Sequence, residues 1–215
     1  MDERATGIIL RTRPLTETSL IVHWLTPELG RIATVAKGAR RPKSSFRGKL
    51  DLFYVCEFTF VRSRRSELHA LREATLRETN SSLRKDLGWL EQATYAALLI
   101  EQATETETPL VTFYDLLTGL VKHLPAHPPE ARTIFAFELK LLAELGLQPD
   151  LAASPLTPGA REILKKLAAL DWPALSCLKP TIAQARELQL FLHRLLAEHF
   201  DRIPTNRTSA LGLAI

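Results

Sequence analysis

The sequence predicts an α+β protein of two domains: a small β-barrel in residues 1–80 and an all-α helical domain in residues 81–215. Two observations predict this division. Short β-favouring stretches separated by turn residues fill the first 80 residues, whereas apolar residues recur at helical spacing from Leu83 onward. A chain of 215 residues fits one or two domains, with a core large enough to fold without disulfides.

Five short strands are expected in the first domain, and such a series is typical of a small closed barrel. Their predicted ranges are 7–13, 19–25, 31–37, 50–62 and 66–72. Trp24, at the end of the second strand, is expected in the barrel core. Alternation along the fourth strand places Phe58 on its apolar face and Phe53 opposite. Phe53 is therefore expected either to stack on a nucleic-acid base or to pack between the domains.

The second domain is expected to consist of helices with loops between them. Predicted helices cover about 83–104, 110–123 and 131–145, and two more begin after Thr157 and Thr181. Residues 131–145 are apolar almost all round, which predicts a central buried helix. Pro158 suits the first position of its helix, and Thr181 suits the N-cap of the last long one.

Composition predicts a cytoplasmic protein without a membrane span. The longest apolar run, 96–100, is far below the roughly 20 residues that a span needs. The first residues are acidic and contain no apolar segment, so no secretory signal is expected. The two cysteines, Cys56 and Cys177, suit a reducing compartment. We expect a monomer when the protein is on its own.

No residue pattern predicts catalysis, a cofactor or a metal. The sequence contains no phosphate-binding glycine loop, no HExxH and no GxSxG, so an enzyme is not expected. A nuclease or hydrolase whose site leaves no motif is the alternative. His123 and His127 are four residues apart, but Pro125 between them is expected to break the helix that would align them. No CxxC pair is present.

Positive charge is concentrated in the first domain. The net charge of +4 divides into +6 for residues 1–80 and −2 for residues 81–215. Residues 31–49 hold seven cations and no acid. Within them, residues 38–49 form a predicted flexible segment, the basic loop, which also carries Phe46. Its five cations are Arg40, Arg41, Lys43, Arg47 and Lys49.

A cationic segment with aromatic or guanidinium planes is what single-stranded nucleic acid requires, since phosphates need charge and bases need stacking partners. Arg62, Arg64 and Arg65 form a second basic turn and are further candidates for nucleic-acid contact. This turn lies either near the basic loop or at the opposite end of the barrel. An RNA-binding module and an adaptor for acidic protein partners are alternative interpretations of the same charges.

Two blocks of sequence resemble a known family. Residues 17–32, ETSLIVHWLTPELGRI, and 35–44, VAKGARRPKS, resemble the N-terminal domain of the bacterial recombination mediator RecO. Residues 137–149, FELKLLAELGLQP, resemble the central helix of that family, and 156–159 the start of its next helix. The resemblance implies an oligonucleotide-binding (OB) barrel followed by a helical domain, and a non-enzymatic role in repair of DNA gaps and breaks.

The resemblance also implies partners. RecO-like proteins bind single- and double-stranded DNA, anneal complementary strands, engage the acidic C-terminal tail of the single-stranded DNA-binding protein SSB, and with RecR help RecA to load. Such a protein is expected at the nucleoid during repair. The implied DNA-contact positions are Arg13, Arg31, Lys37, Arg40, Arg41, Lys43 and Arg47. Candidates for holding an acidic tail in the helical domain are Lys165, Lys166, Arg186 and Arg194.

One departure from the family concerns zinc. Many family members carry a four-cysteine zinc module after a Leu-Gly-x-x-Pro segment. Here residues 147–155 contain no cysteine, so zinc binding is not carried over to this chain.

Overall fold

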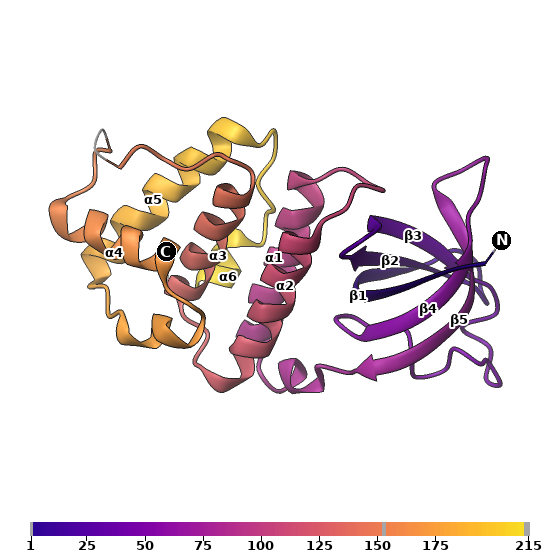
Figure 1. Cartoon of the computed structure of the whole chain (residues 1–215). Helices are drawn as coiled ribbons and strands as arrows, with labels where there is room; N and C mark the ends of the chain where they lie inside the picture. Colours follow the sequence, from indigo (N-terminus) through magenta and orange to yellow (C-terminus); the bar gives the residue numbers. More distant parts are fainter. Residues whose placement is uncertain (1, 152–153, 213–215) are drawn as a thin grey trace. The chain divides into compact units, whose positions relative to one another are not determined.

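The computed structural model describes residues 2–151 and 154–212, and these form two compact units (Figure 1). The first unit comprises the residues up to Ser81 together with Thr104–Thr118. The second comprises Ser82–Ala103 and the residues from Gly119 onward. In the described part of the chain, no helix is both long enough and apolar enough to cross a membrane.

The first unit contains a closed five-stranded barrel, as the sequence predicts. Its strands follow each other around the barrel in the order β1-β2-β3-β5-β4, and only the β3–β5 pair is parallel. The strands are β1 (Asp2–Pro14), β2 (Leu20–Thr26), β3 (Gly30–Ala36), β4 (Val55–Val61) and β5 (Leu68–Glu78). The long β1 pairs with β2 along its second half and with β4 along its first half, which closes the cylinder.

The fourth strand is shorter than predicted. It begins at Val55 because Phe53 has a positive φ of 62° and the amide of Tyr54 donates to the carbonyl of Asp51 (3.1 Å), so residues 51–54 turn. Alternation therefore does not apply at Phe53. Its side chain is fully buried, and the interpretation that it stacks on a nucleic-acid base is wrong.

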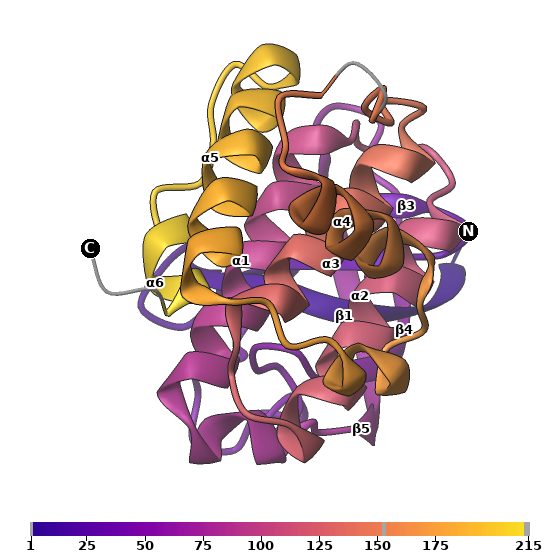
Figure 2. The same cartoon turned by 90° about the vertical axis from the view of Figure 1, so that its left-hand side faces the viewer.

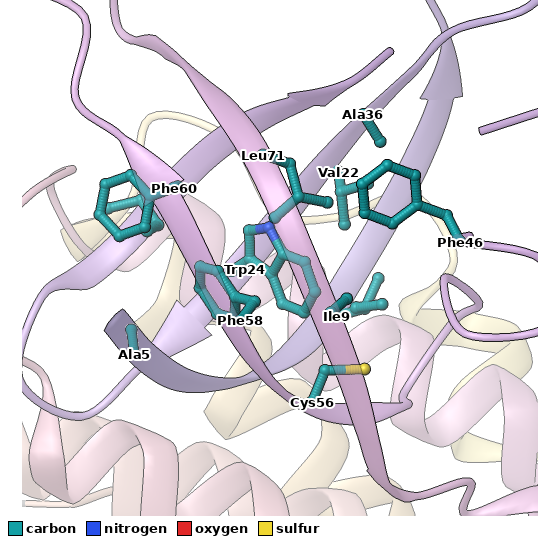
Figure 3. Packing of buried hydrophobic residues seen from close by; sticks show 12 residues of the cluster. Ala5, Ile9, Val22, Trp24, Ala36, Phe46, Cys56, Phe58, Phe60 and Leu71 are labelled. Carbon is teal, nitrogen blue, oxygen red and sulfur yellow. The ribbon is translucent and has the colours of Figure 1, made fainter. Parts of the chain in front are cut away.

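The barrel core is built around Trp24, as expected. Its indole stacks on Phe58 with ring centroids 4.1 Å apart, and its Nε1 donates to Thr34 Oγ1 at 2.8 Å. The hydrogen bond satisfies the one polar atom of the buried ring. Figure 3 shows the ring of Phe46, from outside the strands, pointing into the same cluster.

The second unit is helical. Its helices are α1 (Leu87–Ala103), α3 (Ala131–Glu144), α4 (Pro158–Ala169), α5 (Ile182–His199) and α6 (Arg207–Leu211), and α2 (Val111–His123) begins in the first unit. Short 3-10 segments cover Ser81–Lys85, Leu124–Ala126 and Pro173–Cys177. The helix α3 is central, as predicted, because α1, α4, α5 and α6 all pack against it (Figure 2).

Two predicted helix starts are confirmed in detail. The Thr157 side chain accepts from the amide of Ala160, with Pro158 as the first helical residue of α4. Thr181 and Gln184 form a reciprocal capping box at the start of α5. The five-residue helix α6 is not anticipated by the sequence pattern, and it contributes Arg207 to the interior of this unit.

Candidate nucleic-acid interface

The basic loop, residues 38–49, follows β3 and is a series of linked turns. The amide of Arg41 donates to the carbonyl of Gly38 (3.0 Å), and that of Ser44 donates to the carbonyl of Arg41 (3.0 Å). The amide of Lys49 closes the last turn on the carbonyl of Phe46 (3.0 Å). Local hydrogen bonds therefore give a segment without regular secondary structure a defined path.

The aromatic residue of this loop has a different role from the one that the sequence suggests. Phe46 is only 7% exposed and belongs to the barrel core. It anchors the loop to the barrel. Its ring is consequently not an exposed stacking platform, and the planar side-chain groups exposed on this loop are the guanidinium groups of its arginines.

Most of the predicted DNA-contact residues of this region are exposed. Lys49 is half-buried; the exposed residues are Lys37, Arg40, Arg41, Lys43 and Arg47. Two of the arginines are positioned by backbone carbonyls: Arg40 Nη1 donates to Thr16 (3.2 Å), and Arg47 Nη1 donates to Pro42 (3.2 Å). Because a guanidinium has five N–H donors, each keeps further donors for a phosphate.

Arg13 lies at the same end of the barrel as the basic loop. It pairs with Ile21 near the end of β1, and the neighbouring Leu20 pairs with Ala36, the last residue before the loop region. The amide of Arg40 donates to the carbonyl of Thr18 in the β1–β2 turn (2.9 Å), which ties the loop to that turn.

His23 marks a strongly positive stretch of the β1–β2 surface. Burial, followed by the charges of Arg11, Arg13 and Arg31, lowers its pKa to about 4. Arg11 is not among the residues predicted from the sequence, although its spacing of two from Arg13 on a predicted strand places both side chains on one face. The pairing of Arg11 with His23 brings it to this surface.

Arg31 and Arg62 lie away from the basic loop. Arg31 is the second residue of β3, so about 20 Å of strand separates it from the basic loop. Its guanidinium donates to the carbonyl of Thr104. Arg62 donates to both oxygens of Glu3 (2.9 and 3.1 Å) and to Glu107 (2.6 Å). The Arg62 hydrogen bond lowers the pKa of Glu3.

The position of the second basic turn follows from these contacts. The amide of Glu107 donates to the carbonyl of Arg31 (3.0 Å), so Arg62 lies at the Arg31 end of β3. Of the two positions that the sequence leaves open, the structure has the one opposite the basic loop. Arg64 and Arg65 are exposed there.

The candidates for binding an acidic tail are exposed on two helices of the second unit. Lys165 and Lys166 lie on α4, and Arg186 and Arg194 lie on α5. Lys166 Nζ is 3.8 Å from Glu162, one turn earlier on the same helix. A pocket of about 310 Å³ beside α5, lined in part by Leu190 and His193, includes none of the four.

The α-helix ends at His123, before Pro125, yet His123 and His127 lie side by side. Their rings stack with centroids 4.0 Å apart, because a single 3-10 turn, Leu124–Ala126, accommodates Pro125 and continues the path of α2. Burial lowers the pKa of His123 to about 4, with smaller effects of His127 and Arg132. Among the residues that the structure describes, no three histidine, cysteine or acidic side chains are grouped to hold a metal.

Comparisons with known proteins agree with this architecture. Residues 1–80 match the family model for the N-terminal part of recombination protein O, and residues 84–155 match the model for its C-terminal part. The DNA repair protein RecO of Rhodopirellula baltica is 35% identical over 143 residues, which are 66% of this chain and 53% of that protein. That of Listeria monocytogenes serotype 4b (strain CLIP80459) is 33% identical over 150 residues, 69% of this chain and 58% of that protein.

The fold and the surface therefore define a class, an OB-type barrel with a cationic loop followed by a helical region. The chain belongs to the RecO family of recombination proteins. It spans between one half and three fifths of the length of the curated relatives described above.

Proposed function

We propose that this protein is a recombination mediator in DNA repair that binds single- and double-stranded DNA through the basic loop and Lys37. The observation that carries the proposal is the exposure of five cations at one end of a closed barrel: Lys37 and four residues of the basic loop, whose backbone is held by turns and by Phe46. Family membership supports it, since the relatives are named DNA repair proteins.

The proposed mechanism is electrostatic and involves no covalent step. Two complementary strands repel each other through their phosphates, and cations that contact both reduce this repulsion and release bound counterions. Backbone carbonyls already position Arg40 and Arg47, so little side-chain conformational freedom is lost when they bind phosphate. Annealing of complementary strands is the activity that such a surface supports.

The proposal extends to protein partners through the family. We propose that the helical unit engages the acidic tail of SSB through exposed cations of α4 and α5, and that the protein acts with RecR to help RecA load. Lys165, Lys166, Arg186 and Arg194 are the candidates for holding the carboxylates. The site of action would be the bacterial cytoplasm, at the nucleoid.

The direct test is annealing of complementary oligonucleotides coated with SSB. We expect the wild-type protein to accelerate annealing and the triple variant R40A/R41A/K43A to lose most of the acceleration. The variant R64A/R65A removes exposed arginines from the same barrel but at the other end, and it is expected to stay close to wild type. Failure of the wild-type protein to accelerate annealing would contradict the proposal.

A further inference from the structure

A pocket of about 400 Å³ lies between the basic loop and the beginning of β2. Its apolar side is formed by Leu20, Ala39 and Leu50, which are partly buried and pack against the barrel core, together with Phe46. Accessible apolar side chains in a pocket with polar surroundings favour binding of a flat, weakly hydrated group.

The rim of the same pocket is cationic. Arg40, Arg41 and Arg47 all line it, and none of the other described residues that line it is acidic. Two of these arginines are held in place, Arg40 by the Thr16 carbonyl and Arg47 by the Pro42 carbonyl. The guanidinium planes can stack on an aromatic ring, and their N–H groups match phosphate oxygens.

We infer that this pocket binds one unpaired nucleotide of a single DNA strand. The base lies on Leu20, Ala39 and Leu50, with a guanidinium against one face, and the two flanking phosphates contact the arginine rim. A nucleotide carries both of the features that the pocket complements, an apolar flat ring and adjacent negative charges. The inference rests on the proposed DNA binding and deepens it, because it separates contacts to bases from contacts to phosphates.

This arrangement has a consequence for strand selectivity. In a duplex each base is paired and stacked between its neighbours, so a base enters the pocket only at an energetic cost of unstacking. Phosphates, in contrast, are accessible in both forms of DNA. The rim therefore serves single and double strands alike, whereas the apolar side adds affinity for single strands alone.

The test compares DNA ligands that differ only in their bases. The ligands are a single-stranded oligonucleotide, the same backbone with abasic sites, and the duplex, measured by fluorescence anisotropy. For the wild-type protein we expect the abasic strand to bind at least about fivefold more weakly than the intact strand, the effect of losing one stacked base. This comparison uses the wild-type protein alone, so its result does not depend on whether a variant folds.

A matched pair of variants locates the effect. Ala39→Phe fills the pocket without changing the charge, and Ser45→Phe adds the same ring at an exposed position of the same loop outside the pocket lining. We expect A39F to lose the preference for intact over abasic strands and to keep its affinity for the duplex. S45F is expected to retain the preference.

Three results would overturn the inference. Equal binding of intact and abasic strands by the wild-type protein would show that phosphates alone are recognised, and DNA binding itself would stand. Equal loss of single-strand and duplex binding in A39F would give the pocket no role in base recognition. The third result concerns an acidic peptide with an aromatic C-terminus. If it binds the wild-type protein, is not displaced by single-stranded DNA and no longer binds A39F, the pocket belongs to a protein partner. Absence of all DNA binding would instead contradict the proposed function.

Discussion

The carboxylate of Glu138 accepts two hydrogen bonds from the guanidinium of Arg207, one from Nε at 2.7 Å and one from Nη2 at 2.9 Å. Glu138 is fully buried, and the Arg207 side chain is 7% exposed. Tyr95 Oη donates to the same carboxylate at 2.6 Å, and burial, followed by the charge of Glu138, raises the pKa of Tyr95 well above its usual value. The ion pair thereby fixes α6 to α3 inside the helical unit.

Removing Arg207 leaves the buried Glu138 carboxylate with the Tyr95 hydroxyl but without a counter-charge. We expect Arg207→Met to lower the free energy of unfolding by about 3–5 kcal/mol, measured by urea denaturation. Lys166→Met, which removes an exposed cation 3.8 Å from Glu162, is the control and is expected to change it by less than about 1 kcal/mol. A similar small effect of both substitutions would contradict a structural role for the buried pair.

Arg62 and its neighbours Arg64 and Arg65 are expected to differ in their effects. Arg62 connects Glu3 in β1 with Glu107, so Arg62→Gln is predicted to lower the free energy of unfolding by about 1 kcal/mol and to leave DNA affinity within twofold. R64A/R65A is predicted to leave stability unchanged. Chemical denaturation and anisotropy on the same samples check both statements. A strong loss of DNA affinity in Arg62→Gln would place this turn in the interface.

Gly30 and Gly48 both have a positive φ, but only at Gly30 would a Cβ also clash with a neighbouring atom. Gly30 has a φ of +64°, and a Cβ at this position would lie 1.8 Å from the carbonyl oxygen of Thr108. Gly48 has a φ of +72° with nothing within 4 Å of such a Cβ. We expect Gly48→Ala to cost about 1 kcal/mol of stability for the backbone alone, and Gly30→Ala to cost clearly more. Equal costs in thermal unfolding would show that the Thr108 segment moves freely.

His23 is predicted to titrate far below an ordinary histidine. Its pKa in the folded state is about 4, because burial and the charges of Arg11, Arg13 and Arg31 all oppose protonation. The unfolded chain binds a proton at His23 near pH 6.5. Between these values the unfolded state holds more protons, so stability falls as the pH is lowered from about 6.5 to about 4 and changes no further from this group below that.

The NMR titration of the His23 ring protons measures this directly. We expect a midpoint near pH 4 in the wild-type protein. In Arg13→Gln the midpoint is expected to be higher, because one of the three opposing charges is gone. A wild-type midpoint near 6.5 would contradict the positive surface described for β1 and β2.

The sequence predicts much of the architecture because local signals carry it. Turn residues and alternation predict the five strands, and Thr157 and Thr181 predict two helix starts because a capping side chain acts within three residues of its own position. The concentration of cations in residues 31–49 likewise predicts an exposed charged loop, since a segment with seven cations and no acid of its own is costly to bury.

The features that the sequence does not predict are contacts between residues far apart in the chain. Arg62 binds acids 59 and 45 residues away, which no local pattern indicates. Phe46 is buried in the barrel core although it lies in the basic loop, and Phe53 is buried at a turn where a continuous strand is predicted. Arg207 counts as a surface residue in any hydropathy pattern, and only the position of Glu138 makes its burial favourable.

The central claim is that the basic loop and Lys37 contact phosphate. The salt dependence of binding to a single-stranded oligonucleotide tests it most directly. With about five phosphates neutralised, the slope of log K against log salt concentration is predicted to be about −3.5, and in R40A/R41A/K43A it is predicted to fall to about −1.4. A wild-type slope near zero, or a triple variant with the wild-type slope and affinity, would contradict the account.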